Sequence, residues 1–493
     1  MRRFLLHQYK SNGLNIVLDV NSGAVHLVDD VTYDLLPLYE TTVLGERSEK
    51  TKEELSEKLR EENTAETKEA IIEQLSRTYP KADIEEALEE VKQLEQAGVL
   101  FTRDEYEDLH IAHTEPVVKA LCLHIAHDCN LACRYCFAEE GEYHGRRALM
   151  SLETGKAALD FLIANSGNRR NLEVDFFGGE PLMNWFVVKE IVAYGRALEA
   201  GHDKHFRFTL TTNGVLLDEE MIAFANQLLP SGEPQIANVV LSLDGREEVH
   251  DRMRPFRGGQ GSYELVAPKL LRFAKERGQK NYYVRGTFTR HNLDFAEDVL
   301  HLADLGFTQI SVEPVVADTN EDYAIQTEDL PRAFAEYDAL AAEMIRRRKE
   351  GKGFCFFHFM IDLEGGPCVA KRLRGCGAGT EYLAVTPWGD LYPCHQFAGE
   401  DGLKIGTVTE GITNTKLREI FSKVNVYSKP ACKNCFAKFY CSGGCGANSY
   451  HFSETAGDTL AHKLNQPYEI GCELQRKRVE CAIMIKAMES SEL

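Results

Sequence analysis

The sequence contains no apolar run long enough to cross a lipid bilayer, and it lacks an excess of positive charge. Its 493 residues include 77 acidic and 56 basic side chains, which gives a formal net charge of -21. Such an excess of negative charge disfavours nucleic acid and anionic membranes as principal partners. Only the three apolar residues at positions 4–6 follow the initial Met-Arg-Arg, fewer than a secretory signal needs. We therefore expect a cytoplasmic protein with no nucleic-acid or membrane partner.

Cysteine, by contrast, is abundant and clustered. The sequence has 14 cysteines, and cytosolic reductants keep such thiols from forming disulfides, so their clustering indicates bound metal. Cys122, Cys355 and Cys481 lie apart from the others and are expected to be ordinary core residues. The clustered cysteines are Cys129, Cys133, Cys136, Cys368, Cys376, Cys394, Cys432, Cys435, Cys441, Cys445 and Cys472.

The chain is too long for one hydrophobic core, so several domains are expected. Strand-like alternation near residues 14–28 and helical spacing near residues 83–96 indicate an N-terminal unit over residues 1–105. Within it, Asp30 is expected to cap the first helix. A repeating strand-helix pattern follows over 106–330, then a linker or bridging helix over 331–364. Residues 365–493 are rich in glycine and cysteine, a composition that needs bound metal to hold its shape.

The central part of the chain predicts an α/β fold, an open barrel of six parallel strands with crossover helices between them. Parallel barrels carry their chemistry at the carboxyl ends of the strands. The expected strands lie near residues 121–125, 172–177, 207–212, 237–243, 283–289 and 308–314.

Small and polar residues follow several of these strands. The glycine pair allows close backbone approach, a carboxylate suits an ammonium group, and the remaining side chains are hydrogen-bond donors or acceptors. A tight turn would explain the glycine pair equally well, and a buried ion pair would explain Arg285 and Glu313. The candidate residues are Gly178, Gly179, Glu180, Thr212, Asn213, Ser242, Asp244, Arg285 and Glu313.

The first strand is followed by Cys129-x3-Cys133-x2-Cys136, three thiols on one short loop. Structural zinc and electron-transfer clusters usually take four protein ligands. Three ligands would leave one metal position open, as a catalytic metal does for its substrate. The alternative is a four-ligand site that recruits a distant cysteine.

This spacing resembles the signature of the radical S-adenosylmethionine (SAM) superfamily, with Tyr135 and Phe137 at its aromatic position. The resemblance implies that Cys129, Cys133 and Cys136 hold a 4Fe-4S cluster whose open iron binds SAM. It also implies reductive cleavage of SAM to a 5'-deoxyadenosyl radical, so that the cofactor performs the difficult chemistry. The glycine pair and the polar strand ends would then contact SAM. A redox or metal scaffold without a substrate would predict no SAM cleavage.

The carboxyl-terminal cysteines resemble the SPASM module of radical SAM enzymes that modify peptides. By that resemblance, two further 4Fe-4S clusters are expected, which makes three in all. The outer auxiliary cluster would be bound by Cys432, Cys435, Cys441 and Cys472, and the inner one by Cys376, Cys394 and Cys445. Cys368 is a candidate fourth ligand of the inner cluster, whose iron would otherwise stay open for a substrate cysteine. A zinc ribbon is the alternative for the close cysteine pairs.

The N-terminal unit resembles the winged-helix-like domain with which such maturases bind a precursor's leader peptide. Residues 15–26 and 376–395 resemble maturases of the six-cysteine SCIFF peptides. This resemblance implies thioether crosslinks from cysteine sulfur to an acceptor carbon, in the sactipeptide and ranthipeptide class. It also implies a cysteine-rich precursor and a flavodoxin or ferredoxin as partners. The alternative enzyme is an anaerobic sulfatase-maturating type, which forms formylglycine and carries aspartate where this chain has His395.

Overall fold

The protein is described from a computed structural model. The structure describes residues 5–41, 68–107, 117–363, 369–453 and 459–491. Among these residues, no helix is long and apolar enough to cross a membrane.

The N-terminal unit is a small antiparallel sheet covered by helices. Strands β1 (Leu6–Ser11), β2 (Leu14–Asp19) and β3 (Val25–Val28) pair in the order β1-β2-β3. Helices α1 (Asp30–Tyr39) and α4 (Lys81–Gln96) pack on it through a hydrophobic cluster that includes Val17 and Leu35. The strand alternation and the helix expected from the sequence are confirmed, whereas β1 was not predicted.

The predicted cap of the first helix is wrong by one residue. The Asp29 side chain, not that of Asp30, accepts a hydrogen bond from the Thr32 backbone N–H at 2.7 Å. Asp30 is the first helical residue and forms an ion pair with Lys10 at 2.9 Å. Two adjacent aspartates offer equivalent capping groups, and the chain direction at the end of β3 decides between them.

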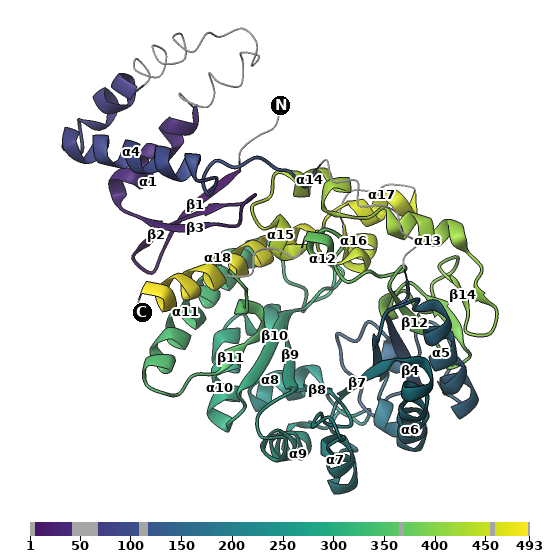
Figure 1. The fold of residues 1–493 in the computed structure, drawn as a ribbon. Coiled ribbons are helices and arrows are strands. Elements are labelled where there is room, and N and C mark those ends of the chain that lie inside the picture. Colours follow the sequence, from purple (N-terminus) through teal and green to yellow (C-terminus); the bar gives the residue numbers. More distant parts are fainter. Residues whose placement is uncertain (1–4, 42–67, 108–116, 364–368, 454–458, 492–493) are drawn as a thin grey trace.

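The central unit is the predicted parallel sheet, and all six expected strands are present. They pair in the order β10-β9-β8-β7-β6-β4, and helices cover the outer face (Figure 1). The strands are β4 (Ala120–His127), β6 (Asn171–Gly178), β7 (His205–Thr212), β8 (Asn238–Ser242), β9 (Tyr282–Phe288) and β10 (Gln309–Pro314). The helices are α5 (Leu152–Asn165), α6 (Trp185–His202), α7 (Glu219–Asn226), α8 (Glu247–Met253), α9 (Tyr263–Glu276) and α10 (Phe295–Leu305).

The sheet continues beyond these six strands at both edges. Strand β11 (Cys355–Phe356) pairs parallel to β10, and β12 (Tyr382–Val385) pairs parallel to β4. Strands β13 (Asp390–Tyr392), β14 (Gly406–Thr407) and β15 (Gly411–Ile412) extend the β12 edge antiparallel. The cysteine-rich region is therefore built directly onto the strand that precedes the three-cysteine loop.

Short helices complete the carboxyl-terminal region, and one long helix returns across the molecule. The short helices are α12 (Val369–Arg374), α13 (Thr415–Ser422), α14 (Pro430–Lys433), α15 (Lys438–Cys441), α16 (Gly446–Phe452) and α17 (Leu460–Asn465). The long helix α18 (Glu469–Ser491) lies beside α11 (Leu330–Lys349) (Figure 1).

The N-terminal unit docks on the carboxyl-terminal region. The His7 ring stacks on Phe436 with ring centroids 3.5 Å apart, and it contacts the carboxylate of Glu480 in α18 at 2.9 Å. At the end of the N-terminal unit, Asp104 forms an ion pair with Lys438 at 2.6 Å, and the Lys438 side chain is only 2% exposed. A buried ammonium needs such a partner, so this pair fixes the docking.

We predict that Asp104→Asn destabilises the protein by about 3–5 kcal/mol, because it leaves the Lys438 ammonium buried without its partner. Thermal unfolding of the variant would show a lower midpoint. Asp203→Asn is the matched control, since Asp203 pairs with Arg170 across a gap open to water, with 91% and 72% of the two side chains exposed. An equal midpoint for both variants would contradict this account.

Candidate active site

The three-cysteine loop follows β4 directly, at the carboxyl end of the sheet. Cys129, Cys133 and Cys136 are half-buried. Burial raises the pKa of the Cys129 thiol to about 12 and that of Cys133 to about 11. Thiols with such pKa values are poor nucleophiles at neutral pH, but a bound metal ion deprotonates them. This donor set therefore fits metal coordination better than covalent catalysis by a cysteine.

The loop is held by close backbone packing between the ends of β4 and β6. Gly178 has φ +116°, and a Cβ atom there would lie 2.4 Å from the Ala126 carbonyl oxygen. A Cβ atom on Gly179 would lie 2.1 Å from the carbonyl oxygen of Asp128, the residue before Cys129. Both positions exclude any side chain. The glycine pair thus serves the close approach of two loops.

Glu180 joins the ends of β6 and β7. Its carboxylate accepts hydrogen bonds from the Leu182 backbone N–H at 2.9 Å, the Thr212 hydroxyl at 2.9 Å and the Asn213 backbone N–H at 2.8 Å. The residue is 1% exposed, and burial raises its pKa while these hydrogen bonds oppose the rise. In this arrangement Glu180 positions Thr212 and Asn213. A direct contact from Glu180 to SAM stays a prediction.

Asn213 reaches back to the three-cysteine loop. Its side-chain amide donates to the Asn130 carbonyl oxygen Oδ1 at 2.7 Å and lies 3.6 Å from the Cys129 sulfur. An N–H group near a thiolate sulfur stabilises its negative charge. Asn213 is therefore placed to stabilise negative charge on the Cys129 sulfur, and its contact with SAM stays a prediction.

Tyr135 stands in a buried polar network that the sequence revealed only in part. Its hydroxyl contacts both carboxylate oxygens of Asp244, at 2.7 and 2.9 Å, and accepts a hydrogen bond from Arg254 at 2.8 Å. Burial raises the pKa of Asp244 to about 6. Sequence reasoning missed Arg254. Burial alone would lower the pKa of its guanidinium group, but Cys133, Tyr135 and Asp244 hold that pKa well above its usual value. A basic residue shortly after the fourth strand was the only signal.

The remaining aromatic and hydroxyl candidates lie at the same end of the sheet. Phe137 is 45% exposed, and its ring lies 5.5 Å from that of His395 and 5.9 Å from that of Tyr143. Phe137 thus faces the β12 side of the structure. Ser242 is the last residue of β8 and is half-buried. Contacts from either residue to SAM remain predictions.

Arg285 and Glu313 lie on the inner face of the sheet and pair with each other at 2.8 Å. Burial raises the pKa of Glu313, but Arg285 and neighbouring cationic groups outweigh it and bring the value to about 2. His358 lies 3.9 Å from the same carboxylate, and Arg478 of α18 contacts His358 at 3.3 Å. The ion pair that was the alternative explanation for these two residues is present, but the Arg285 and Glu313 side chains are 49% and 34% exposed rather than fully buried. The network around it reaches the carboxyl-terminal helix.

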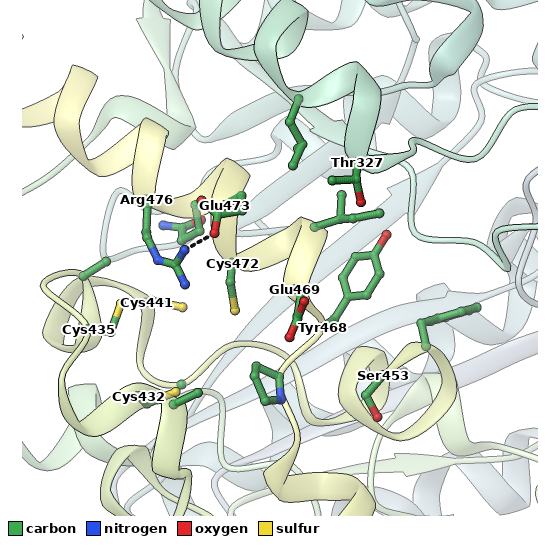
Figure 2. Close-up of a pocket in the computed structure, with 18 of the residues that line it drawn as sticks. Thr327, Cys432, Cys435, Cys441, Ser453, Tyr468, Glu469, Cys472, Glu473 and Arg476 are labelled. Atoms are coloured by element: carbon green, nitrogen blue, oxygen red, sulfur yellow. Dashed lines mark hydrogen bonds and ion pairs between the residues drawn. The ribbon is translucent and has the colours of Figure 1, made fainter. Parts of the chain in front are cut away.

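Four carboxyl-terminal cysteines share one cavity. Cys432, Cys435, Cys441 and Cys472 line a space of about 550 Å³, with their sulfur atoms grouped at one side (Figure 2). Burial raises the pKa of Cys432 to about 11 and that of Cys472 to about 12. This is the set that the sequence predicted for an outer cluster. Among the described residues, no three cysteine, histidine or acidic side chains are placed to hold a single metal ion.

The other predicted set is also brought together. Cys394 is buried, and its thiol is close enough to Cys445 and Cys376 for both to raise its pKa, after burial as the main cause. Cys376 and Cys445 are exposed. Cys368 lies outside the described residues. Cys122 and Cys481 are buried as expected for core residues, whereas Cys355 is half-buried.

We predict that Gly179→Ala weakens SAM binding about 5- to 150-fold, since the new methyl group forces the three-cysteine loop away from β6. An overpacking cost of about 1–3 kcal/mol corresponds to that range. Iron content and SAM binding of the reconstituted protein measure the effect. Gly201→Ala in α6 is the control, because a Cβ atom there meets nothing within 4 Å. Unchanged binding in Gly179→Ala would refute the packing argument.

Several curated proteins are similar in sequence over most of this chain. The mycofactocin maturase MftC of Mycolicibacterium smegmatis is 28% identical over 67% of this chain and 79% of its own length. The PqqA peptide cyclase of Rhodopseudomonas palustris is 27% identical over 71% of this chain and 87% of its own length. The subtilosin biosynthesis protein AlbA of Bacillus subtilis is 25% identical over 66% of this chain and 68% of its own length.

The fold is that of known enzymes with the same partial barrel. The solved structure of native anSMEcpe with bound AdoMet and a Kp18Cys peptide matches with a TM-score of 0.58 and 17% identity, covering 77% of this chain and all of that chain. Residues 123–303, which contain the three-cysteine loop and most strand-end candidates, match the model of the radical SAM superfamily. Enzymes of that superfamily use SAM and a 4Fe-4S cluster, so the similarity favours an enzyme over a metal scaffold without a substrate. This chain is therefore an enzyme with a radical SAM region at residues 123–303.

Proposed function

We propose that this enzyme matures a ribosomally made precursor peptide by forming intramolecular thioether crosslinks from cysteine sulfur to an acceptor carbon. The observation that carries the proposal is the similarity, over two thirds of the chain, to proteins named for peptide maturation and for biosynthesis of the bacteriocin subtilosin. The resemblance of residues 15–26 and 376–395 to SCIFF maturases narrows the proposal to the sactipeptide and ranthipeptide class.

The proposed cofactors are SAM and three 4Fe-4S clusters. Cys129, Cys133 and Cys136 would hold the SAM-binding cluster, and SAM cleavage there would supply the radical that abstracts hydrogen. The four cysteines of the cavity in Figure 2 would hold the outer auxiliary cluster. Cys376, Cys394 and Cys445 would hold the inner one, with Cys368 as a candidate fourth ligand. The separation of the thiols into a strand-end loop, a cavity and a third group supports three sites.

The proposed chemistry is an oxidation of the peptide. One hydrogen leaves the acceptor carbon as an atom and becomes part of 5'-deoxyadenosine, and one leaves the cysteine thiol as a proton. A carbon–sulfur bond forms, and one electron remains for an acceptor. The chain's own task is to hold the two reacting groups together and to exclude water.

The polar network on the inner face of the sheet supports a peptide substrate there. Arg285 and Glu313 lie on neighbouring strands, and the Glu313 end opens to a cavity of about 500 Å³ that also contains Cys445. Phe357 and Met360 at its rim are 47% and 58% exposed. Polar groups with apolar neighbours are the usual lining of a ligand site. We assign this cavity to the peptide segment that is modified.

The N-terminal unit is the proposed leader-binding domain. Strand β3 lies at one edge of its three-stranded sheet, and Leu27 on this strand is 43% exposed. An extended peptide can add to such an edge through backbone hydrogen bonds. The docking of this unit through His7 and Asp104 would hold a bound leader in a fixed position relative to the cysteine-rich region. A flavodoxin or ferredoxin is the proposed electron donor.

A second candidate is oxidation of one cysteine or serine to formylglycine, as in anaerobic sulfatase-maturating enzymes. The likeness in fold to anSMEcpe favours it. His395 stands where that family carries aspartate, and its ring nitrogen contacts the Tyr382 hydroxyl at 3.2 Å, while burial lowers its pKa to about 4. The departure from aspartate at this position, where an uncharged imidazole stands in place of a carboxylate, favours the thioether.

The test is an anaerobic assay with reconstituted enzyme, SAM, dithionite and a cysteine-rich peptide encoded beside the gene. We predict 5'-deoxyadenosine and a peptide lighter by two hydrogens with its sulfur retained. The Cys129→Ala variant should lose both products, because its loop cannot hold the SAM-binding cluster. Exchange of sulfur for oxygen at a cysteine, or a peptide aldehyde formed from a serine, would instead identify the formylglycine reaction.

The Cys481→Ala variant is the matched control, since Cys481 is a buried cysteine outside all three proposed sites. It should retain both products. SAM cleavage that persists in Cys129→Ala would refute the assignment of the loop.

A further inference from the structure

Lys429 is a buried lysine with an unusual environment. The residue is 2% exposed, although lysine is rarely buried without a partner. Its ammonium group donates a hydrogen bond to the Gly443 carbonyl oxygen at 2.7 Å. In the part of the chain that the structure describes, no carboxylate forms an ion pair with it. A charge in this position needs an anionic neighbour of another kind.

The neighbours of Lys429 are cysteines from both auxiliary sets. Burial lowers the pKa of the ammonium group, and the groups that oppose this are the thiols of Cys432, Cys441, Cys445 and Cys472. Three of these line the cavity of Figure 2, and Cys445 belongs to the inner set. Lys429 also lines a small cavity together with Cys376, another member of the inner set. Its side chain therefore lies between the two proposed auxiliary sites.

The hydrogen bond of Lys429 reinforces this placement. Gly443 has φ +82° and lies in the loop between Cys441 of the outer set and Cys445 of the inner set. The ammonium group thus holds the short segment that joins ligands of both sites. A cluster with thiolate ligands is an anion that becomes more negative on reduction, so it supplies the missing partner, and a nearby fixed cation favours its reduced state.

We propose that Lys429 is a positioning residue for electron acceptance, whose positive charge between the two auxiliary sites raises the reduction potentials of both clusters. The inference rests on the proposed function, in which carbon–sulfur bond formation leaves one electron for an acceptor. An oxidised auxiliary cluster would take up this electron, and a higher potential would make the transfer more favourable. A lysine that served only to fill space would have no such effect.

The test is a redox titration followed by electron paramagnetic resonance. Cys129, Cys133 and Cys136 are replaced by alanine in all proteins, so that only auxiliary clusters contribute. Lys429→Met should shift the auxiliary midpoint potentials to more negative values, whereas Lys429→Arg, which keeps the charge, should shift them much less. Lys433→Met is a further control, because Lys433 lies beside Cys432 but its side chain is 47% exposed, and water screens its charge.

Each outcome decides the proposal. The parent is the protein with the three loop cysteines replaced. Equal auxiliary midpoint potentials in this parent and in Lys429→Met, with full iron in both, would overturn the proposal. A shift in Lys429→Arg as large as that in Lys429→Met would also overturn it. If Lys429→Met retains no iron, full iron in Lys429→Arg supports the role of the charge, and loss in both overturns it. The absence of auxiliary clusters from the parent protein would instead refute the cluster assignment of the proposed function.

Discussion

The close packing of Gly178 and Gly179 against the end of β4 is the constraint on which the site depends. Because a side chain at either position would collide with the backbone of residues 126–128, the three-cysteine loop has one way to leave the sheet. The Glu180 carboxylate then fixes the end of β7 by accepting a hydrogen bond from the Asn213 backbone N–H, and the Asn213 side-chain amide contacts the Cys129 sulfur. One tight turn thus places both the three-cysteine loop and the groups that surround it.

The same edge also anchors the cysteine-rich region. Strand β12 pairs parallel to β4, so the segment that leads to Cys394 begins on the strand that ends at the three-cysteine loop. In the outer set, Cys472 comes from α18, which also contacts the N-terminal unit through Glu480. Three regions distant in sequence thereby pack against one another, as the proposed reaction between two bound peptide groups requires.

The sequence predicted the parts of this arrangement that depend on local pattern. Strand periodicity located all six barrel strands, and spacing identified the cysteine sets, because both signals lie within a few residues. It did not reveal the parallel pairing of β12 with β4, since a strand of four residues carries no information about its partner. Arg254 and Lys429 were also missed, because a lysine or arginine in a sequence is expected at the surface and only the fold shows it buried.

The central claim is that Cys129, Cys133 and Cys136 hold a cluster with one iron open to SAM. Electron paramagnetic resonance of the reduced, anaerobically reconstituted enzyme tests it directly. Addition of SAM should change the g-values of one cluster signal in the wild type and should have no effect in a protein that lacks these three cysteines. A wild-type spectrum that SAM leaves unchanged would contradict the account.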